Sequence, residues 1–327
     1  MEPPVIIIGA PRSGTSLMSR IIGRHPAIAV PRESHFYDTF LPWITHYGDL
    51  RRPRNRERLL RDILATPRLR RWIPAVDGRE ALARIEANGH FDLNGIVAGI
   101  MEAWTEARGK SRWGEKTPHH LFFADYILEG FPSARFVHIV RDGRDVAVSW
   151  MKARFGPKHV HPAARRWSQH LAVARRLETR LGAQFFQLRY EDLLRDTEAV
   201  VRQLCDFLAV EYFPQMLSPD PSYADYSADI RNRANLVKGV LTENTGRWRQ
   251  MLSRRELRIF EAVAGEDLEA YGYERACPSA RLSRLEALAC IYLEHPPRKI
   301  AAMATNYPSQ IEQLARLKMY LRLRIGL

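Results

Sequence analysis

The chain has 327 residues, of which 46% are hydrophobic and 27% charged. This composition is typical of globular proteins and excludes fibrous, disordered and membrane-spanning classes. Fifty basic and 37 acidic side chains give a formal net charge of +13, and only seven of the fifty are lysines. The planar guanidinium group of arginine can donate two parallel hydrogen bonds to the oxygens of a phosphate or sulfate. An excess of arginine over lysine can also reflect genome composition. The three cysteines form no Cys-x-x-Cys pair, which disfavours a disulfide framework and a zinc site.

The first thirty residues follow a β-turn-α-β pattern. Residues 5–8 (Val-Ile-Ile-Ile) form a β-branched run ending in Gly9, typical of a strand buried on both faces of a parallel sheet. Residues 15–23 place their apolar side chains on one helical face, and residues 28–30 form a second short apolar run. No stretch approaches the roughly 18 apolar residues of a membrane span or the length of a signal segment. We therefore expect a soluble, cytoplasmic protein.

Residues 38–112 have a different character. They contain helical patterns such as residues 57–65 and nine arginines between Arg51 and Arg71, with no strand pattern. We interpret them as a helical insertion that caps the sheet. Its arginines fit a solvated helix face, or else a patch for an acidic acceptor or a nucleic acid.

The α/β pattern resumes after the insertion. Strands are predicted at 135–140 and 185–188, and helices at 145–154, 162–181 and 197–208, before an irregular polar loop at 214–235. Together these elements predict a P-loop-containing, three-layer α/β domain over residues 1–277. A central, mainly parallel sheet would carry helices on both faces.

Residues 278–327 are predicted to form a helical C-terminal extension. Its last helix opens with the capping box Ser309-x-x-Glu312 and continues as an amphipathic pattern with basic residues around it. Such a helix packs against the body or a partner subunit, or lies on a membrane surface. A homo-oligomer and peripheral membrane contact therefore both remain open.

The turn after the first strand has the spacing of a phosphate-binding loop. Gly9 and Gly14 frame G-x-x-x-x-G, and Thr15-Ser16 stand where nucleotide triphosphatases carry Lys-Ser. Backbone N–H groups at a helix N-terminus cradle an anion, and the hydroxyls of Ser13, Thr15 and Ser16 add donors. The missing lysine removes a group that binds β- and γ-phosphates. A donor with fewer phosphates and no metal fits this loop better.

A second pair of anion-binding candidates follows the strand at 135–140. Arg141 stands at the strand end, where a Walker-B carboxylate would be needed for Mg²⁺, and Ser149 lies further along the next helix. Both could contact one oxyanion near the switch region of an open sheet. We assign Arg144 and Asp145 a structural role.

These segments resemble the two signature motifs of the sulfotransferases that use 3′-phosphoadenosine 5′-phosphosulfate (PAPS). The chain is most similar to the branch that contains tyrosylprotein sulfotransferases and many bacterial homologues. The resemblance implies that the first motif holds the 5′-phosphosulfate and the second the 3′-phosphate, without a metal. It rests on residues 11–16, 113–118, 136–149, 188–193, 246–249 and 272–273.

The resemblance also implies roles for single residues. Glu33, 21 residues after the loop arginine, stands at the position of the catalytic glutamate of the tyrosylprotein branch, so it would be the general base. Lys116 would stabilise the bridging oxygen, with Arg12 sharing that task. Tyr190 would contact the nucleotide, and Arg247 would be the C-terminal cation that closes over the donor.

Alternatives remain at several positions. His35 is a rival base, and His119 and His120 are weaker rivals. Ala153 stands where the tyrosylprotein branch has a further arginine, and Lys152 or Arg154 would have to replace it.

Two other functions compete with sulfuryl transfer. A P-loop kinase using ATP–Mg²⁺ shares the loop, and the net charge of +13 would suit a nucleic-acid binder. The chain contains no recognised nucleic-acid module, so we expect no nucleic acid partner. The acceptor of the sulfuryl group (peptide tyrosine, glycan, lipid or small alcohol) cannot be read from the residues.

Overall fold

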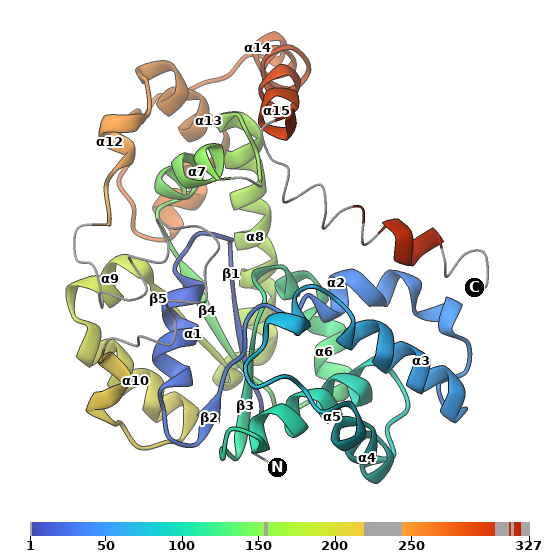
Figure 1. Ribbon diagram of the computed structural model, residues 1–327. Helices are drawn as coiled ribbons and strands as arrows, with labels where there is room; N and C mark the ends of the chain where they lie inside the picture. The colour runs from blue at the N-terminus through green and yellow to red at the C-terminus, as the bar shows by residue number, and fades with distance from the viewer. Residues whose placement is uncertain (1, 154–155, 219–243, 305–313, 315–316, 322–327) are drawn as a thin grey trace.

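The computed structural model describes residues 2–153, 156–218, 244–304, 314 and 317–321. Its centre is a five-stranded sheet with the order β2-β3-β1-β4-β5, in which every pair is parallel (Figure 1). The five strands are β1 (Val5–Gly9), β2 (Ile28–Ala29), β3 (Arg112–Lys116), β4 (Arg135–Val140) and β5 (Phe185–Arg189).

The central strand β1 is buried on both faces because its side chains alternate between two cores. Ile6 and Ile8 face one core, and Val5 and Ile7 face the other. This two-sided burial is typical of parallel sheets covered by helices. The predicted three-layer α/β fold is confirmed.

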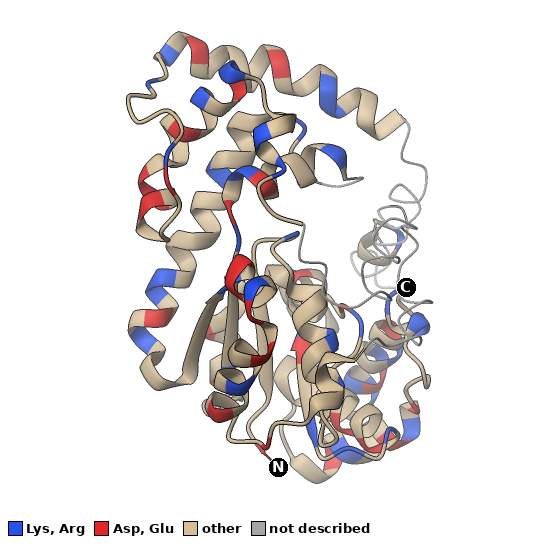
Figure 2. Ribbon diagram, turned by 90° about the vertical axis from the view of Figure 1, so that its left-hand side faces the viewer, with Lys and Arg blue, Asp and Glu red and all other residues tan. Residues whose placement is uncertain are grey.

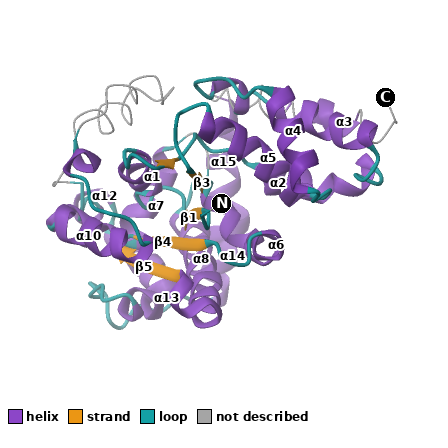
Figure 3. Ribbon diagram, turned by 90° about the horizontal axis from the view of Figure 1, so that it is seen from below, coloured by secondary structure: helices purple, strands orange, loops and turns teal. Residues whose placement is uncertain are grey.

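The helices divide between these cores and a third one. The first core, beside Ile6, is covered by α2 (Phe36–Phe40), α3 (Pro53–Leu64), α4 (Gly78–Asn88), α5 (Leu93–Glu106) and α6 (Ala124–Gly130). The second core is covered by α1 (Thr15–Gly23), α9 (Tyr190–Arg195) and α10 (Thr197–Leu208). The third core joins α7 (Gly143–Lys152), α8 (Val160–Leu181) and α13 (Arg254–Ala270). Figure 3 shows α2 to α5 gathered at one side of the sheet.

Short helical turns and a C-terminal segment complete the described chain. The 3₁₀ turns are η1 (Leu41–Tyr47), η2 (Leu69–Arg71), η3 (Pro118–Phe123), η4 (Gly182–Gln184) and η5 (Pro214–Leu217). After α12 (Trp248–Met251) and α13, the chain continues through α14 (Arg284–Ala289), the π-helical turn η7 (Cys290–Glu294) and α15 (His295–Ala304).

One sequence prediction about the fold is wrong. The sequence analysis placed no strand between the apolar run at 28–30 and the strand at 135–140, but residues 112–116 form β3, between β2 and β1. The polar residues of β3 hide the strand pattern. They tolerate burial because they are paired: Arg112 donates from Nε to the Pro3 carbonyl at 2.6 Å and from Nη1 to the Leu208 carbonyl at 2.7 Å.

The arginine-rich part of the insertion has mixed surroundings. Arg56 is buried and pairs with Glu86 at 2.7 Å, whereas Arg54 and Arg61 on α3 are exposed. In Figure 2 basic and acidic residues are interspersed over the helices. The solvated-face interpretation therefore fits α3 itself.

The predicted C-terminal features are partly described. The capping box at Ser309 and most of the loop at 214–235 lie outside the described residues. Tyr320 stacks on Trp43 with ring centroids 4.5 Å apart, and its hydroxyl donates to the Thr39 carbonyl at 3.3 Å. This part of the last helix therefore packs against the body. Within the described ranges, no helix has the length and apolarity needed to cross a membrane.

The buried centre of the sheet gives a first prediction. Ile7→Ala should lower the free energy of unfolding by about 2–5 kcal/mol, because Ile7 is 0% exposed and its removal leaves a cavity. Ile300→Ala, at a residue that is 68% exposed, should change it by less than about 0.5 kcal/mol. Urea denaturation of both variants measures the difference, and equal values would contradict the described core.

Candidate active site

The loop between β1 and α1 has a backbone conformation that suits anion binding. Gly14 has φ +103°, and a Cβ at this position would lie 2.4 Å from Cδ2 of Tyr190. Glycine is therefore required both by the dihedral angle and by the close ring. The N–H groups of the first turn of α1 follow directly. Ser13 Oγ is buried and has no hydrogen-bond partner among the described residues, as expected for a donor whose partner is a bound anion.

The second predicted motif meets this loop. Arg12 Nε donates to Ser149 Oγ on α7 at 2.9 Å, and Arg141 Nη1 donates to the Arg12 carbonyl at 3.1 Å. Arg12 has φ +79°, an uncommon conformation for a residue with a Cβ. The contacts from β4 and α7 hold it in that conformation. The first predicted motif is thus brought into contact with the second, which lies more than a hundred residues further along the chain.

Arg141 lies at the centre of a further group. Its guanidinium stands 4.7 Å from the centroid of the Tyr190 ring, and Nη2 donates to the Asn244 carbonyl at 2.7 Å. The Tyr190 hydroxyl accepts from Asn244 Nδ2 at 3.0 Å. Arg141 Nε is buried without a partner among the described residues. The predicted Tyr190 and Arg141 therefore form one wall beside the loop.

Asp145 anchors the segment that carries Arg247. Its carboxylate accepts from the Gly246 N–H at 2.8 Å and from the Trp248 N–H at 2.9 Å. Arg247, which immediately precedes α12, is exposed. Arg144 pairs with Asp142 and Glu261, each at 2.8 Å. The structural roles expected for Arg144 and Asp145 are confirmed.

Glu33, Lys116 and the loop form a single hydrogen-bonded group. Lys116 Nζ donates to Glu33 Oε1 at 2.7 Å and to Ser16 Oγ at 3.2 Å. Lys116 is 5% exposed, whereas the Glu33 side chain is 33% exposed. Burial alone would raise the pKa of Glu33, but the Lys116 ammonium and the neighbouring His35 outweigh it and hold that pKa well below its usual range.

The loop that carries Glu33 is tied to the end of β3. Thr117 Oγ1 accepts from the N–H groups of Ser34 and His35 at 3.2 and 3.3 Å. Thr117 Oγ1 also donates to Glu115 Oε1 at 2.6 Å, and Ser34 Oγ donates to the same oxygen at 2.7 Å. Because side chains alternate along a strand, Glu115 faces away from Lys116. Through these hydrogen bonds Glu115 attaches the loop that carries Glu33 to the end of β3.

Both rival histidines of this region lie between carboxylates. His35 contacts Glu33 Oε2 at 3.3 Å and Asp38 Oδ2 at 2.8 Å. His120 contacts Glu115 Oε2 at 2.7 Å and Asp38 Oδ1 at 3.6 Å. Burial would lower both pKa values. The carboxylates outweigh it, raising the pKa of His35 and bringing that of His120 to about 9. The sequence analysis missed Asp38, which links these histidines.

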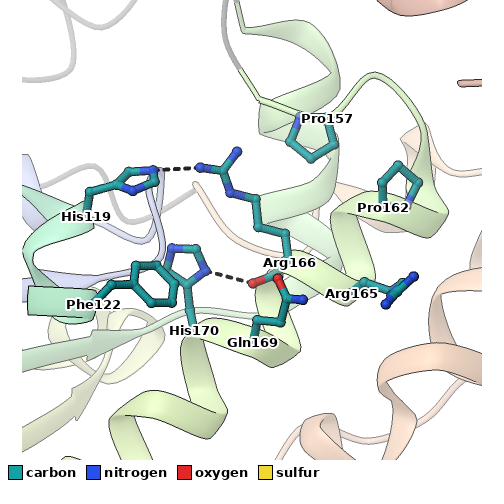
Figure 4. Close-up of a pocket in the computed structure, with 8 residues that line it drawn as sticks. All are labelled: His119, Phe122, Pro157, Pro162, Arg165, Arg166, Gln169 and His170. Atoms are coloured by element: carbon teal, nitrogen blue, oxygen red, sulfur yellow. Dashed lines mark hydrogen bonds between the residues drawn. The ribbon is translucent and has the colours of Figure 1, made fainter. Parts of the chain in front are cut away.

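A cavity of about 440 Å³ lies between η3 and α8 (Figure 4). Phe122 and the cations of Arg165 and Arg166 contribute to its lining. His119, three residues after Lys116, accepts from Arg166 Nη2 at 2.6 Å. Burial, reinforced by the Arg166 charge, lowers the pKa of His119. His119 therefore stands beside a guanidinium at the cavity, outside the Glu33–Lys116 group.

One group of metal-binding residue types lies elsewhere. His159, Cys290 and Glu294 place their ligand atoms within 4.8 Å of one another. His159 Nδ1 accepts from the His161 N–H at 3.2 Å, so Nε2 carries the proton and donates to Glu294 at 3.1 Å. Arg255 also binds Glu294 through two hydrogen bonds. The ring nitrogens of His159 and the carboxylate of Glu294 are thus used in hydrogen bonds, and those of Glu294 attach the C-terminal segment to the body.

Comparison with known proteins assigns the chain to a family and its fold to a known class. Residues 3–214 match the model of the sulfotransferase family, so the chain belongs to that family. The sulfotransferase domain of the curacin biosynthetic pathway has a similar fold. Its TM-score is 0.53 at 18% identity, and the match covers 84% of this chain and 99% of that one.

Three relatives are similar to this chain in sequence. An uncharacterised Aquifex aeolicus protein is 23% identical over 76% of this chain and 30% of its own length. The omega-hydroxy-beta-dihydromenaquinone-9 sulfotransferase Stf3 of Mycobacterium bovis is 24% identical over 86% of this chain and 78% of its own. A Drosophila melanogaster protein-tyrosine sulfotransferase is 24% identical over 76% of this chain and 47% of its own. The chain thus spans less than half of the Aquifex and Drosophila relatives.

The carboxylates around His120 give a prediction for stability. The ordinary pKa of histidine is 6.5 and that of His120 is about 9, so the protonated ring stabilises the fold fully below pH 6.5. This contribution, on the order of 3 kcal/mol, is lost as the pH rises towards 9. His120→Gln should therefore destabilise the protein more at pH 6 than at pH 9.5. Urea denaturation at both pH values checks this, and a pH-independent loss would contradict it.

Proposed function

We propose that the protein transfers a sulfuryl group from PAPS to a hydroxyl or amine acceptor. The observation that carries the proposal is the position of Lys116 Nζ, within hydrogen-bond distance of both Ser16 Oγ of the loop and Glu33 Oε1. A cation at the loop and a carboxylate beside it are the groups that in-line transfer to a protonated acceptor requires. Family membership favours this reaction over the kinase and nucleic-acid alternatives.

The donor would be held at both of its anionic ends. The N–H groups after Gly14 and the hydroxyls of Ser13, Thr15 and Ser16 suit the 5′-phosphosulfate. Arg141 and Ser149 suit the 3′-phosphate, because both stand beside Arg12 at the adjoining strand end. The buried, unpartnered Ser13 Oγ and Arg141 Nε fit this assignment, and no step in it needs a metal. Tyr190 and the exposed Arg247 would contact the nucleotide.

Glu33 is the better general base of the two candidates. Both ring nitrogens of His35 lie close to carboxylates, so its protonated form is favoured and no lone pair is free to accept a proton. Glu33 is partly exposed and can reach an acceptor. His35 is then a positioning residue, which holds Oε2 of Glu33 while Oε1 faces Lys116.

The reaction redistributes the charge of the Lys116–Glu33 pair. The acceptor oxygen forms a bond to sulfur, and its proton passes to Glu33. The bond from sulfur to the bridging oxygen breaks, and the electron pair stays on that oxygen of the departing 3′,5′-bisphosphate. Lys116, with Arg12, stabilises the charge that develops there. As Lys116 turns to this oxygen, Glu33 loses its nearest cation and becomes more basic.

The relatives support a hydroxyl acceptor. The Mycobacterium bovis relative is named for a hydroxylated menaquinone, and the Drosophila melanogaster relative is named for protein tyrosine. The cavity beside His119 offers an apolar surface at Phe122 and cations at Arg165 and Arg166. It would suit the remainder of an acceptor that carries both an apolar part and a negative charge.

Loss of the base should stop turnover without affecting donor binding. Glu33→Gln should reduce transfer of radiolabelled sulfur from PAPS to acceptors in a cell extract by about a hundred- to ten-thousandfold. The reason is that the amide cannot accept the proton, although it preserves the size of the side chain. Gel or thin-layer separation of the labelled products measures the transfer.

Glu57→Gln, at an exposed position of α3, is the matched control and should retain full transfer. Calorimetric titration with 3′-phosphoadenosine 5′-phosphate should give equal affinities for the wild type and both variants. Unchanged transfer by Glu33→Gln would remove it as the base. Tight binding of ATP–Mg²⁺ with none of the bisphosphate would overturn the proposed function.

His35 should act through the pKa of Glu33. Its hydrogen bond and charge lower that pKa, so His35→Asn should raise it. Because a carboxylate base is active above its pKa, the acidic limb of the kcat/KM profile should move to higher pH, with plateau activity kept within about tenfold. His90→Asn, at an exposed site, should leave the profile unchanged. Loss of activity at every pH would instead identify His35 as the base.

A further inference from the structure

The C-terminal segment formed by α14, η7 and α15 turns polar side chains towards the body. Glu286 pairs with Arg258 on α13 and lies 3.8 Å from Arg255. Glu294 binds Arg255 Nη1 and Nη2 at 2.9 and 2.7 Å and also contacts His159. Cys290, midway between the two glutamates, is 0% exposed. The inward face of this segment is thus held by ion pairs at Glu286 and Glu294, eight residues apart, with the buried Cys290 between them.

The outward side of the same segment is apolar. Leu285 is 80% exposed, Tyr292 68% and Ile300 68%. Leu288, Leu293 and Met303 are also exposed, at 49%, 72% and 48%. A surface helix of a globular protein ordinarily buries its apolar stripe and exposes its polar one. This segment departs from that rule, because six of its large apolar side chains are exposed, and such exposed apolar groups mark an interaction site.

The charged residues next to the exposed apolar side chains indicate which kind of partner this surface would bind. Between residues 278 and 304 the only acidic residues are Glu286 and Glu294, and both are engaged by cations of the body. The cations Arg284, Arg298 and Lys299 are exposed. No ion pair joins these three cations to an acidic group among the residues that the structure describes. Apolar side chains bordered by such cations are complementary to an anionic lipid surface, where apolar side chains enter the interface and cations meet the headgroups. A second copy would instead bring like charges together.

We propose that α14, η7 and α15 dock the protein on the surface of an anionic phospholipid bilayer. Leu285, Tyr292 and Ile300 enter the interfacial region, and Arg298 and Lys299 bind headgroup phosphates. The ion pairs of Glu286 and Glu294 keep the segment attached to α13, so the whole enzyme body is held at the membrane. Figure 1 places α14 and α15 at one end of the molecule beside α13.

Vesicle co-sedimentation of the full chain tests the proposal. The wild type should bind phosphatidylcholine vesicles that contain phosphatidylserine. Its partitioning onto vesicles of pure phosphatidylcholine should be at least tenfold weaker. The variant Leu285→Gln/Tyr292→Gln/Ile300→Gln should lose at least tenfold in partitioning, because glutamine keeps the helix but not the apolar side. Arg298→Gln/Lys299→Gln should weaken binding to the anionic vesicles alone. Raising the salt concentration should weaken the wild type in the same way.

Controls separate this surface from the other parts of the chain. Phe122→Gln removes an apolar side chain that is 44% exposed in the cavity at η3, and it should leave vesicle binding unchanged. Circular dichroism should give equal melting of all variants. Binding of the triple variant equal to that of the wild type would overturn the proposal. So would a wild-type dimer that becomes monomeric in the triple variant without any vesicle binding.

Discussion

The ion pair between Lys116 and Glu33 joins the parts of the candidate site. Lys116 reaches it from the end of β3, Glu33 from the loop after β2, and Ser16 from the first turn of α1. Three neighbouring segments of a parallel sheet thus meet at its carboxyl edge, where open α/β sheets bind ligands. The Lys116 ammonium also holds the pKa of Glu33 below its usual range. In the proposed reaction, Glu33 would become more basic once Lys116 turned to the leaving oxygen.

A buried layer of alternating charge supports this pair. His35, Asp38, His120 and Glu115 follow one another from the Glu33 loop back to β3, each within 3.6 Å of the next. Isolated, any of these groups would be costly to bury, but each lies between partners of opposite charge. These contacts hold the Glu33 loop against the end of β3, which carries Lys116. In the proposed reaction, a large part of catalysis would therefore depend on residues that do not touch the donor.

The same use of paired charges attaches the C-terminal segment. Two glutamates bind arginines of α13, and this leaves the apolar side of the segment turned outward. In the candidate site, ion pairs position Glu33 and Lys116; at the end of the molecule, they attach a segment whose apolar side chains are exposed. Docking at a membrane would bring the enzyme close to lipid-borne acceptors, one of the classes that the relatives represent.

Sequence alone was sufficient where the signal is local. The β-branched run at 5–8, the glycine-framed loop and the apolar spacing of α1 and α10 each report on their own backbone, so these elements were predicted. Local motifs also identified Arg12, Arg141 and Ser149, but only the structure shows that Arg12 contacts both of the other residues. Strand β3 was missed because Arg112, Glu115 and Lys116 look solvent-exposed in sequence. Only tertiary structure supplies the carbonyls, carboxylates and hydroxyls that make their burial tolerable.

The same holds for the pairing of Glu33 with Lys116, for the contact of Asp38 with His120 and for the outward apolar side of α14–α15, which all depend on distant partners. An ion pair across the fold has no local pattern, and its partners become neighbours only once the sheet and helices have assembled.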